Sequence, residues 1–138
     1  MADSTSLQTV RARILIVDDH PNTGPTLARI LAGALKSVEI LTALNGQEAL
    51  AVIGEGVDVL IVDYLMPGMT GLELIEQLRA LPIRQPAHII LITAHHSAEL
   101  VALSRQAHID DYLVKPVYPK QILGLVEDAL HNLFPTSA

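Results

Sequence analysis

The 138-residue sequence contains no cysteine and no tryptophan, and its aromatic residues are three tyrosines and one phenylalanine. Without cysteine, the protein cannot have a disulfide scaffold, a thiolate metal site or a cysteine nucleophile, and it suits a reducing compartment. Basic residues are also scarce, with 9 Lys and Arg against 15 Asp and Glu and a net charge of −6. Broad contact with a phosphate backbone needs clustered Lys and Arg, so we predict no direct nucleic-acid partner.

No apolar run has the length needed to span a bilayer, and the N-terminal MADSTSLQTV lacks the basic and apolar regions of a signal peptide. We therefore expect a cytoplasmic protein with no membrane contact. Half of the residues are hydrophobic, almost all of them aliphatic, which is enough for the core of a single domain. We expect a flexible leader over residues 1–11, one domain over 12–134 and a tail over 135–138.

Apolar runs alternate along the chain with stretches whose apolar residues recur at helical spacing. The runs predict strands over 13–17, 38–42, 57–62, 88–93 and 110–114. The stretches between and after them predict a helix over 21–35, a second from the turn at 45–46 to about 53, a third over 72–81, a fourth that ends at about 106, and a last one after 116 whose apolar positions run from 122 to 130. Several of the strands are almost continuously apolar, which is typical of a parallel sheet covered on both faces. The predicted fold class is α/β, a doubly wound five-stranded parallel sheet with helices on both faces.

Polar side chains follow the predicted strands: Asp18 and Asp19 after the first, Asp63 after the third, Thr93 at the end of the fourth and Lys115 after the fifth. In open parallel sheets, sites form beyond the carboxyl ends of the strands. Each aspartate alone is typical of a helix cap or a turn. Three carboxylates at one edge, however, repel one another unless a cation joins them, and an all-oxygen ligand set favours Mg²⁺.

This combination suits the transfer of a phosphoryl group to a carboxylate. Aspartate is a known nucleophile for forming an aspartyl phosphate. A metal ion and Lys115 would neutralise charge on the phosphoryl oxygens, and the Thr93 hydroxyl would bond one of them. The strand that ends at Asp63 is therefore interpreted as placing a phosphoacceptor at the edge of the sheet.

With the motif DYLMPGMTG that begins at Asp63, these residues resemble the receiver domain of bacterial two-component response regulators, from about residue 13 to residue 134. The resemblance implies the flavodoxin-like strand order 2-1-3-4-5. It also implies that Asp63 accepts a phosphoryl group from the phosphohistidine of a histidine kinase. The implied Mg²⁺ (or Mn²⁺) ligands are Asp19, Asp63 and the backbone carbonyl of Leu65, with Asp18 binding through water.

The resemblance further implies a switch in which Tyr112 turns inward when the Thr93 hydroxyl moves toward the phosphoryl group. The face formed by the fourth helix, the fifth strand and the fifth helix would then repack and change partner binding. The Lys115-Pro116 peptide bond is implied to be a candidate for the cis form.

Some positions depart from the pattern of the family. His108-Ile109 stands where relatives usually have Gly-Ala, which puts a tight glycine turn there in doubt. Leu65 and His95 lie where the family tunes the access of water to the phosphoryl group, and the apolar Leu65 cannot position a water molecule. His20 is interpreted as a loop residue, and the pair His95-His96 is a poor metal site because adjacent side chains rarely point the same way.

The expected partners are a sensor histidine kinase or phosphotransfer protein and a downstream effector protein or output domain, and a phosphorylation-dependent homodimer is a further expectation. No turnover of external substrates is expected. One alternative is that the chain is the receiver part of a larger hybrid kinase, cyclic-dinucleotide enzyme or transcription factor. Another is a Mg²⁺-dependent phosphatase with Asp63 as nucleophile, but such enzymes have a second aspartate two residues after the nucleophile, where this chain has Leu65.

Overall fold

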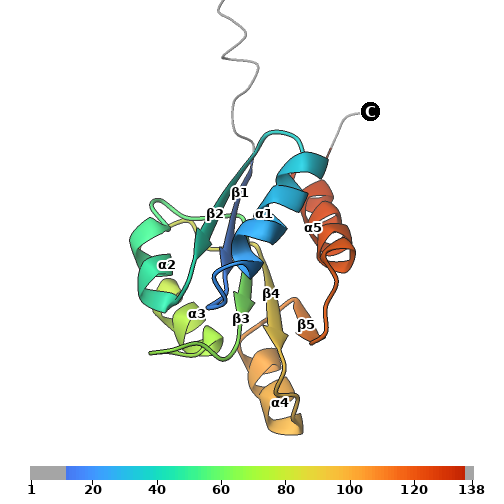
Figure 1. The fold of residues 1–138 in the computed structure, drawn as a ribbon. Helices are drawn as coiled ribbons and strands as arrows, with labels where there is room; N and C mark the ends of the chain where they lie inside the picture. The colour runs from blue at the N-terminus through green and yellow to red at the C-terminus, as the bar shows by residue number, and fades with distance from the viewer. Residues whose placement is uncertain (1–11, 136–138) are drawn as a thin grey trace, which may run out of the picture.

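The structure is a computed structural model that describes residues 12–135, so the expected leader over 1–11 and most of the expected tail lie outside the described residues. Five strands and five helices alternate along the chain, as the sequence predicts (Figure 1). The strands are β1 (Ala12–Val17), β2 (Val38–Ala43), β3 (Val59–Asp63), β4 (His88–Thr93) and β5 (Asp111–Val114), and the helices are α1 (Thr23–Ala34), α2 (Gly46–Val52), α3 (Gly71–Arg79), α4 (Ala98–Gln106) and α5 (Pro119–Leu133). Most predicted boundaries agree to within two residues.

All strands are parallel and lie in the order β2-β1-β3-β4-β5, which confirms the predicted fold class and topology. Helices α1 and α5 cover one face of the sheet, and α2 and α3 cover the other, with α4 beside α3 (Figure 1). The winding direction reverses between β1 and β3, where a doubly wound sheet places its site.

The core has two layers because neighbouring residues of one strand point to opposite faces. Leu15 and Leu60 belong to the cluster under α2 and α3, whereas Ile16 and Ile61 belong to the cluster under α1 and α5. Both faces of the central strands are therefore apolar, which accounts for the continuous hydrophobic runs in the sequence. Asp63 follows Ile61 by two residues on the same strand, so its side chain points to the same face of the sheet, the one covered by α1 and α5.

Ion pairs and a hydrogen bond between a histidine and an aspartate bridge elements along the edge where the strands begin, here called the amino edge. Arg13 pairs with Glu39 at 2.8 Å between β1 and β2, and His88 pairs with Asp111 at 2.6 Å between β4 and β5. Asp58, just before β3, forms an ion pair with Arg84 and accepts the backbone amide of Arg13 at 2.7 Å. These contacts join neighbouring strands where the chain enters the sheet.

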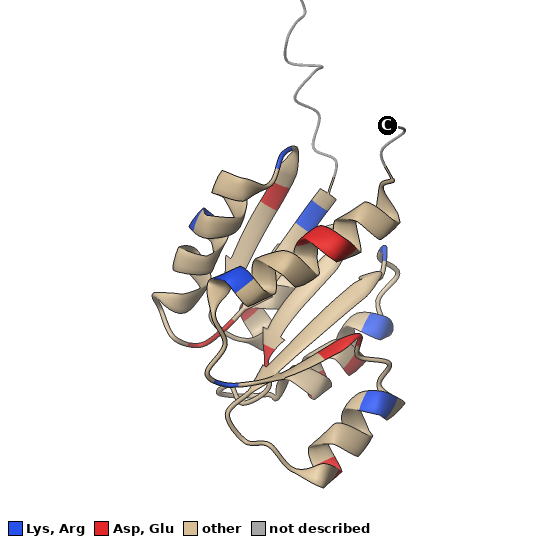
Figure 2. Cartoon of the chain, turned by 90° about the vertical axis from the view of Figure 1, so that its right-hand side faces the viewer, with Lys and Arg blue, Asp and Glu red and all other residues tan. Residues whose placement is uncertain are grey.

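Charged residues are spread over many elements. In the view of Figure 2, the Lys and Arg positions lie singly on separate elements.

Over residues 12–135, no helix combines the length and the apolar character that a bilayer-spanning helix requires.

Candidate functional site

The opposite edge, here called the carboxyl edge, gathers the predicted acidic residues. The sheet register pairs Val17 with Val62, so Asp18 and Asp63 occupy the next positions on adjacent strands. One carboxylate oxygen from each of Asp18, Asp19 and Asp63 lies within 4.8 Å of the others. Asp18 and Asp63 are buried and Asp19 is exposed, so the cluster opens to solvent on one side.

Lys115 supplies the cation of this edge. Its Nζ lies 3.1 Å from Oδ2 of Asp63, and its backbone amide donates to the carbonyl of Thr93 at 2.8 Å, which fixes the end of β5 beside the end of β4. The peptide bond between Lys115 and Pro116 is cis.

Burial raises the pKa of Asp63, which is 6 % exposed. The hydrogen bond and the charge of Lys115 lower this pKa, while the charges of Asp18 and Asp19 raise it. A cavity of about 520 Å³ between α1 and α5 adjoins Asp63, and its apolar lining includes Ile61. This apolar lining accounts for the desolvation of the Asp63 carboxylate. A cation bound near Asp18 and Asp19 would relieve their repulsion of Asp63.

The chain after β3 is held by backbone bonds on both sides of Leu65. The amide of Tyr64 donates to the carbonyl of Ile92 at 2.8 Å, and the amide of Gly71 donates to the carbonyl of Tyr64 at 2.7 Å. Thr70 and Glu73 form a capping box that starts α3. Leu65 itself is 51 % exposed, so its side chain faces solvent at the rim of the site.

Gly71, the first residue of α3, has a role that the sequence alone does not indicate. A Cβ atom built at Gly71 would lie 2.7 Å from the carbonyl oxygen of Asp63 and 3.1 Å from side-chain atoms of Val62 and Leu91. Only glycine therefore allows α3 to begin this close to the aspartate. Gly71 lies in the quoted motif, but the contact that requires it depends on how α3 packs.

The loop after β1 orients Asp18. The backbone amide of Asp18 donates to the carbonyl of Ala43 at 3.1 Å, and Oδ1 of Asp18 accepts the amide of His20 at 2.9 Å. Nδ1 of His20 in turn accepts the amide of Asn22 at 3.2 Å. His20 thus acts within its own loop, and Asp18, Asp19 and Asp63 form the potential metal cluster found in the described part of the chain.

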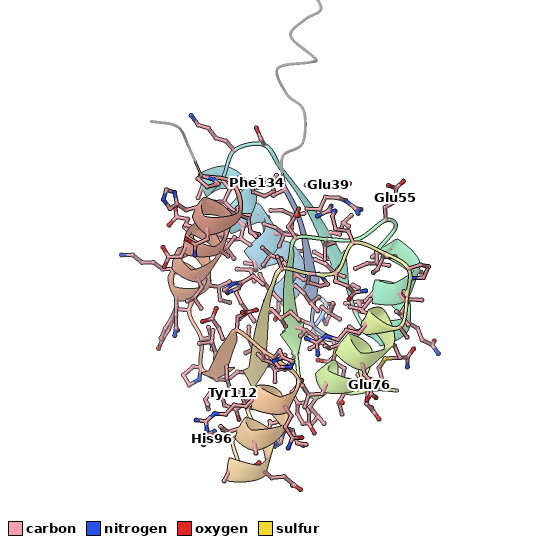
Figure 3. The ribbon with its side chains drawn as sticks, turned by 180° about the vertical axis from the view of Figure 1, so that it is seen from behind. Glu39, Glu55, Glu76, His96, Tyr112 and Phe134 are labelled. Atoms are coloured by element: carbon pink, nitrogen blue, oxygen red, sulfur yellow. The ribbon has the colours of Figure 1, made fainter. Side chains whose placement is uncertain are left out.

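The two residues expected to form a switch lie on neighbouring strands, Thr93 at the end of β4 and Tyr112 in β5. Thr93 is fully buried, and its Oγ1 accepts the amide of His95 at 2.8 Å. Tyr112 is partly buried, and its hydroxyl lies 3.1 Å from Nδ1 of His96 (Figure 3). In the sequence His96 stands out only as half of a poor metal pair, and nothing there indicates this contact, because the direction of a side chain in a loop leaves no periodic pattern.

His108, where relatives usually have glycine, adopts φ 59, a left-handed conformation. The tight turn between α4 and β5 is therefore present although glycine is absent. An L residue with a Cβ bears the steric cost of this conformation.

Together, the sheet order and the edge with three acids and a lysine define the class of phosphoryl-accepting α/β signalling domains. The family model described as response regulator receiver domain matches residues 14–127, and the chain belongs to this family.

The chain is similar to receiver-containing proteins of several lengths. It is 31% identical over 127 residues to the DNA-binding response regulator MtrA of Mycolicibacterium smegmatis, covering 91% of this chain and 54% of MtrA. It is 31% identical to a cyclic di-GMP phosphodiesterase of Thermotoga maritima, covering 86% of this chain and 31% of that protein. A chemotaxis protein CheY homolog of Campylobacter jejuni is 34% identical and is matched over 92% of its length, against 86% of this chain.

Solved structures show the same likeness. A CheY-like receiver domain protein of Methanospirillum hungatei has a TM-score of 0.74 and 31% identity, covering 88% of this chain and 94% of that one. Response regulator TrrA of Thermotoga maritima, in complex with Mg²⁺-BeF, has a TM-score of 0.69 and 37% identity, covering 87% of this chain and all of that one. Receiver domains bind Mg²⁺ at an acidic pocket, and the all-oxygen cluster here fits that ion.

Proposed function

We propose that Asp63 is the phosphoacceptor of a two-component phosphorelay and takes its phosphoryl group from the phosphohistidine of a sensor histidine kinase or phosphotransfer protein. The observation that carries this proposal is the buried Asp63 carboxylate, which contacts Lys115 and lies within 4.8 Å of two further carboxylates. A carboxylate oxygen of Asp63 attacks phosphorus, the bond between phosphorus and the histidine nitrogen breaks, and the imidazole leaves with the electron pair.

The other residues of the carboxyl edge have separate roles in this proposal. Lys115, already next to Asp63, pairs with a phosphoryl oxygen. Asp19, Asp63 and the carbonyl of Leu65 hold Mg²⁺ or Mn²⁺, and Asp18 holds it through water. The metal ion, when bound, supplies positive charge opposite the equatorial oxygens of the transferring group. Leu65 and His95 at the rim set how readily water reaches the phosphoryl group.

The readout proposed is a change of surface rather than turnover of an external substrate. Thr93 moves toward the phosphoryl group and Tyr112 follows it, so that the face formed by α4, β5 and α5 repacks. An effector protein, an output domain or a second copy of the chain then binds this face. The similarity to MtrA and to the phosphodiesterase supports a linked output domain, and the similarity to the CheY homolog supports a separate effector. The cytoplasm is the compartment proposed for both arrangements.

Phosphorylation with a small donor tests the acceptor directly. The protein is incubated with acetyl phosphate and Mg²⁺, and its intact mass is recorded. We expect one phosphoryl adduct that disappears with EDTA or with Asp63→Asn. Asp58→Asn is the matched control, because Asp58 is also a buried aspartate but lies at the amino edge, so this variant should keep the adduct. An adduct on the Asp63→Asn protein would refute the assignment, and so would the absence of both an adduct and beryllofluoride binding in the unchanged protein.

A further inference from the structure

The short loop between β4 and α4 contacts both residues of the proposed switch. At its start, the amide of His95 donates to Oγ1 of Thr93 at 2.8 Å. At the next residue, Nδ1 of His96 lies 3.1 Å from the hydroxyl of Tyr112. Two consecutive loop residues therefore connect the hydroxyl of Thr93, at the end of β4, to a tyrosine on β5.

The contact between His96 and Tyr112 is made by the rings as well as by the hydrogen bond. Their centroids lie 5.7 Å apart and the planes are tilted by 60°. Figure 3 shows the two side chains near one another beside α4. Within residues 12–135, His96 is the hydrogen-bond partner found for this hydroxyl, so the orientation of the phenol depends on it.

His96 also has space in which to move. Its side chain is exposed, and a hollow of about 310 Å³ lies beside it, lined by Tyr64, Leu103 and residues 95–97, 99 and 100. His96 can therefore swing away from Tyr112 without disturbing the core, against which Tyr112 itself is packed. An exposed contact of this kind biases a two-state equilibrium if only one of the two conformations makes it.

We infer that His96 is a positioning residue that holds the Tyr112 hydroxyl at the surface and so favours the unphosphorylated conformation. This inference rests on the proposed roles of Thr93 and Tyr112. Phosphorylation then has to break the contact with His96 before Tyr112 turns inward. By linkage, removing the contact makes the protein bind a phosphoryl analogue more tightly.

Tyrosine NMR tests the position of Tyr112. The protein is labelled with ¹³Cε-tyrosine, which gives signals from Tyr64, Tyr112 and Tyr118 that are assigned with single Tyr→Phe variants. The Tyr112 signal is recorded in the free protein and with Mg²⁺ and beryllofluoride. We expect His96→Ala, without beryllofluoride, to move this signal toward its beryllofluoride position. His96→Asn keeps a polar atom near the place of Nδ1 and should restore the unmodified signal.

Beryllofluoride affinity supplies the second measurement. His96→Ala should bind beryllofluoride roughly two- to tenfold more tightly, the effect of losing one exposed hydrogen bond from the unbound conformation. A merely structural defect would weaken binding instead. In a Tyr112→Phe background, which lacks the hydroxyl but keeps the ring, His96→Ala should change the affinity much less, because only the ring contact is left to lose.

The outcomes separate this inference from the function on which it rests. If beryllofluoride moves the Tyr112 signal of the unchanged protein but His96→Ala leaves signal and affinity unaltered, the inference about His96 is wrong and the switch stands. If beryllofluoride binds without moving the Tyr112 signal, the switch role of Tyr112 is wrong, and the inference falls with it. If neither beryllofluoride nor acetyl phosphate reacts at Asp63, the proposed function itself fails.

Discussion

Nζ of Lys115 lies 3.1 Å from Oδ2 of Asp63, and this single ammonium faces a cluster of three carboxylates. The imbalance explains why the pKa of Asp63 is raised even though a lysine bonds it: burial raises the pKa, Lys115 lowers it, and Asp18 and Asp19 raise it again. The site therefore favours the binding of a further positive charge. Without a bound metal ion, the ionised Asp63 destabilises the fold.

Asp63→Asn should therefore stabilise the metal-free protein near neutral pH. Because the pKa of Asp63 is raised by folding, the penalty is complete above its folded pKa and vanishes as pH falls below the ordinary value of an aspartate. The gain from Asp63→Asn should shrink over that interval. Urea denaturation in EDTA at pH 7.5 and at lower pH measures it, and a gain that grows on acidification would contradict the argument.

Asp58→Asn is the control for this measurement, and the opposite sign is expected. Asp58 is also buried, but it accepts the amide of Arg13 and pairs with Arg84. Weakening these bonds should cost about 1–3 kcal/mol of unfolding free energy at neutral pH. Added Mg²⁺ should stabilise the Asp58→Asn protein as it does the unchanged protein, and should have much less effect on Asp63→Asn.

Gly71→Ala should destabilise the protein and slow its phosphorylation. The added Cβ would lie 2.7 Å from the carbonyl oxygen of Asp63, a backbone atom that moves only with the aspartate. Overpacking of this kind costs about 1–3 kcal/mol. Gly124→Ala, inside α5 with open space around the position, should instead stabilise by about 0.5–1 kcal/mol. Denaturation midpoints and the rate of adduct formation test the pair, and a Gly71→Ala protein with unchanged stability would argue against the close approach.

His108→Gly should stabilise the protein by about 0.5–1 kcal/mol, because glycine adopts a left-handed conformation without the steric cost that His108 bears at φ 59. His108→Ala removes the same side chain but keeps a Cβ, so it should bring no gain. Thermal unfolding of the two variants distinguishes backbone strain from loss of the imidazole, which would affect both alike.

Ser104→Ala should stabilise α4. Ser104 is buried, and its Oγ has no hydrogen-bond partner among the described residues. Removing an unsatisfied hydroxyl and adding a better helix former should yield about 1 kcal/mol. Ser97→Ala makes the same chemical change in the same segment with the opposite result, because the Ser97 hydroxyl caps α4 by accepting the amide of Leu100 at 3.0 Å. Chemical denaturation that ranks Ser97→Ala above Ser104→Ala in stability would contradict both assignments.

The order of elements and the edge that carries the site were predictable from the sequence, because a strand buried on both faces leaves a continuous apolar run and its end is marked by a charge. The residue at which β3 begins was less predictable. The run from Val57 to Val62 suggested a strand over all six residues, yet β3 covers Val59–Asp63. Asp58 instead bonds Arg84 and the amide of Arg13, contacts between segments far apart in the chain.

Contacts that depend on loop packing were not predictable. The proximity of Gly71 to the carbonyl of Asp63 and the bond between His96 and Tyr112 follow from where α3 and the loop before α4 lie. Neither leaves a periodic pattern. His108 illustrates the same limit: the sequence put a tight turn in doubt, whereas the fold imposes the turn on a residue poorly suited to it.

The two edges of the sheet differ in how well their charges are matched. At the amino edge Arg13 and Asp58 form opposite-charge pairs with Glu39 and Arg84, and Asp111 lies 2.6 Å from His88, so each of these carboxylates has a partner. The carboxyl edge concentrates like charge and is electrostatically frustrated. A change in charge at the carboxyl edge therefore acts on a site whose charges are unbalanced, whereas the carboxylates paired at the amino edge already have their partners.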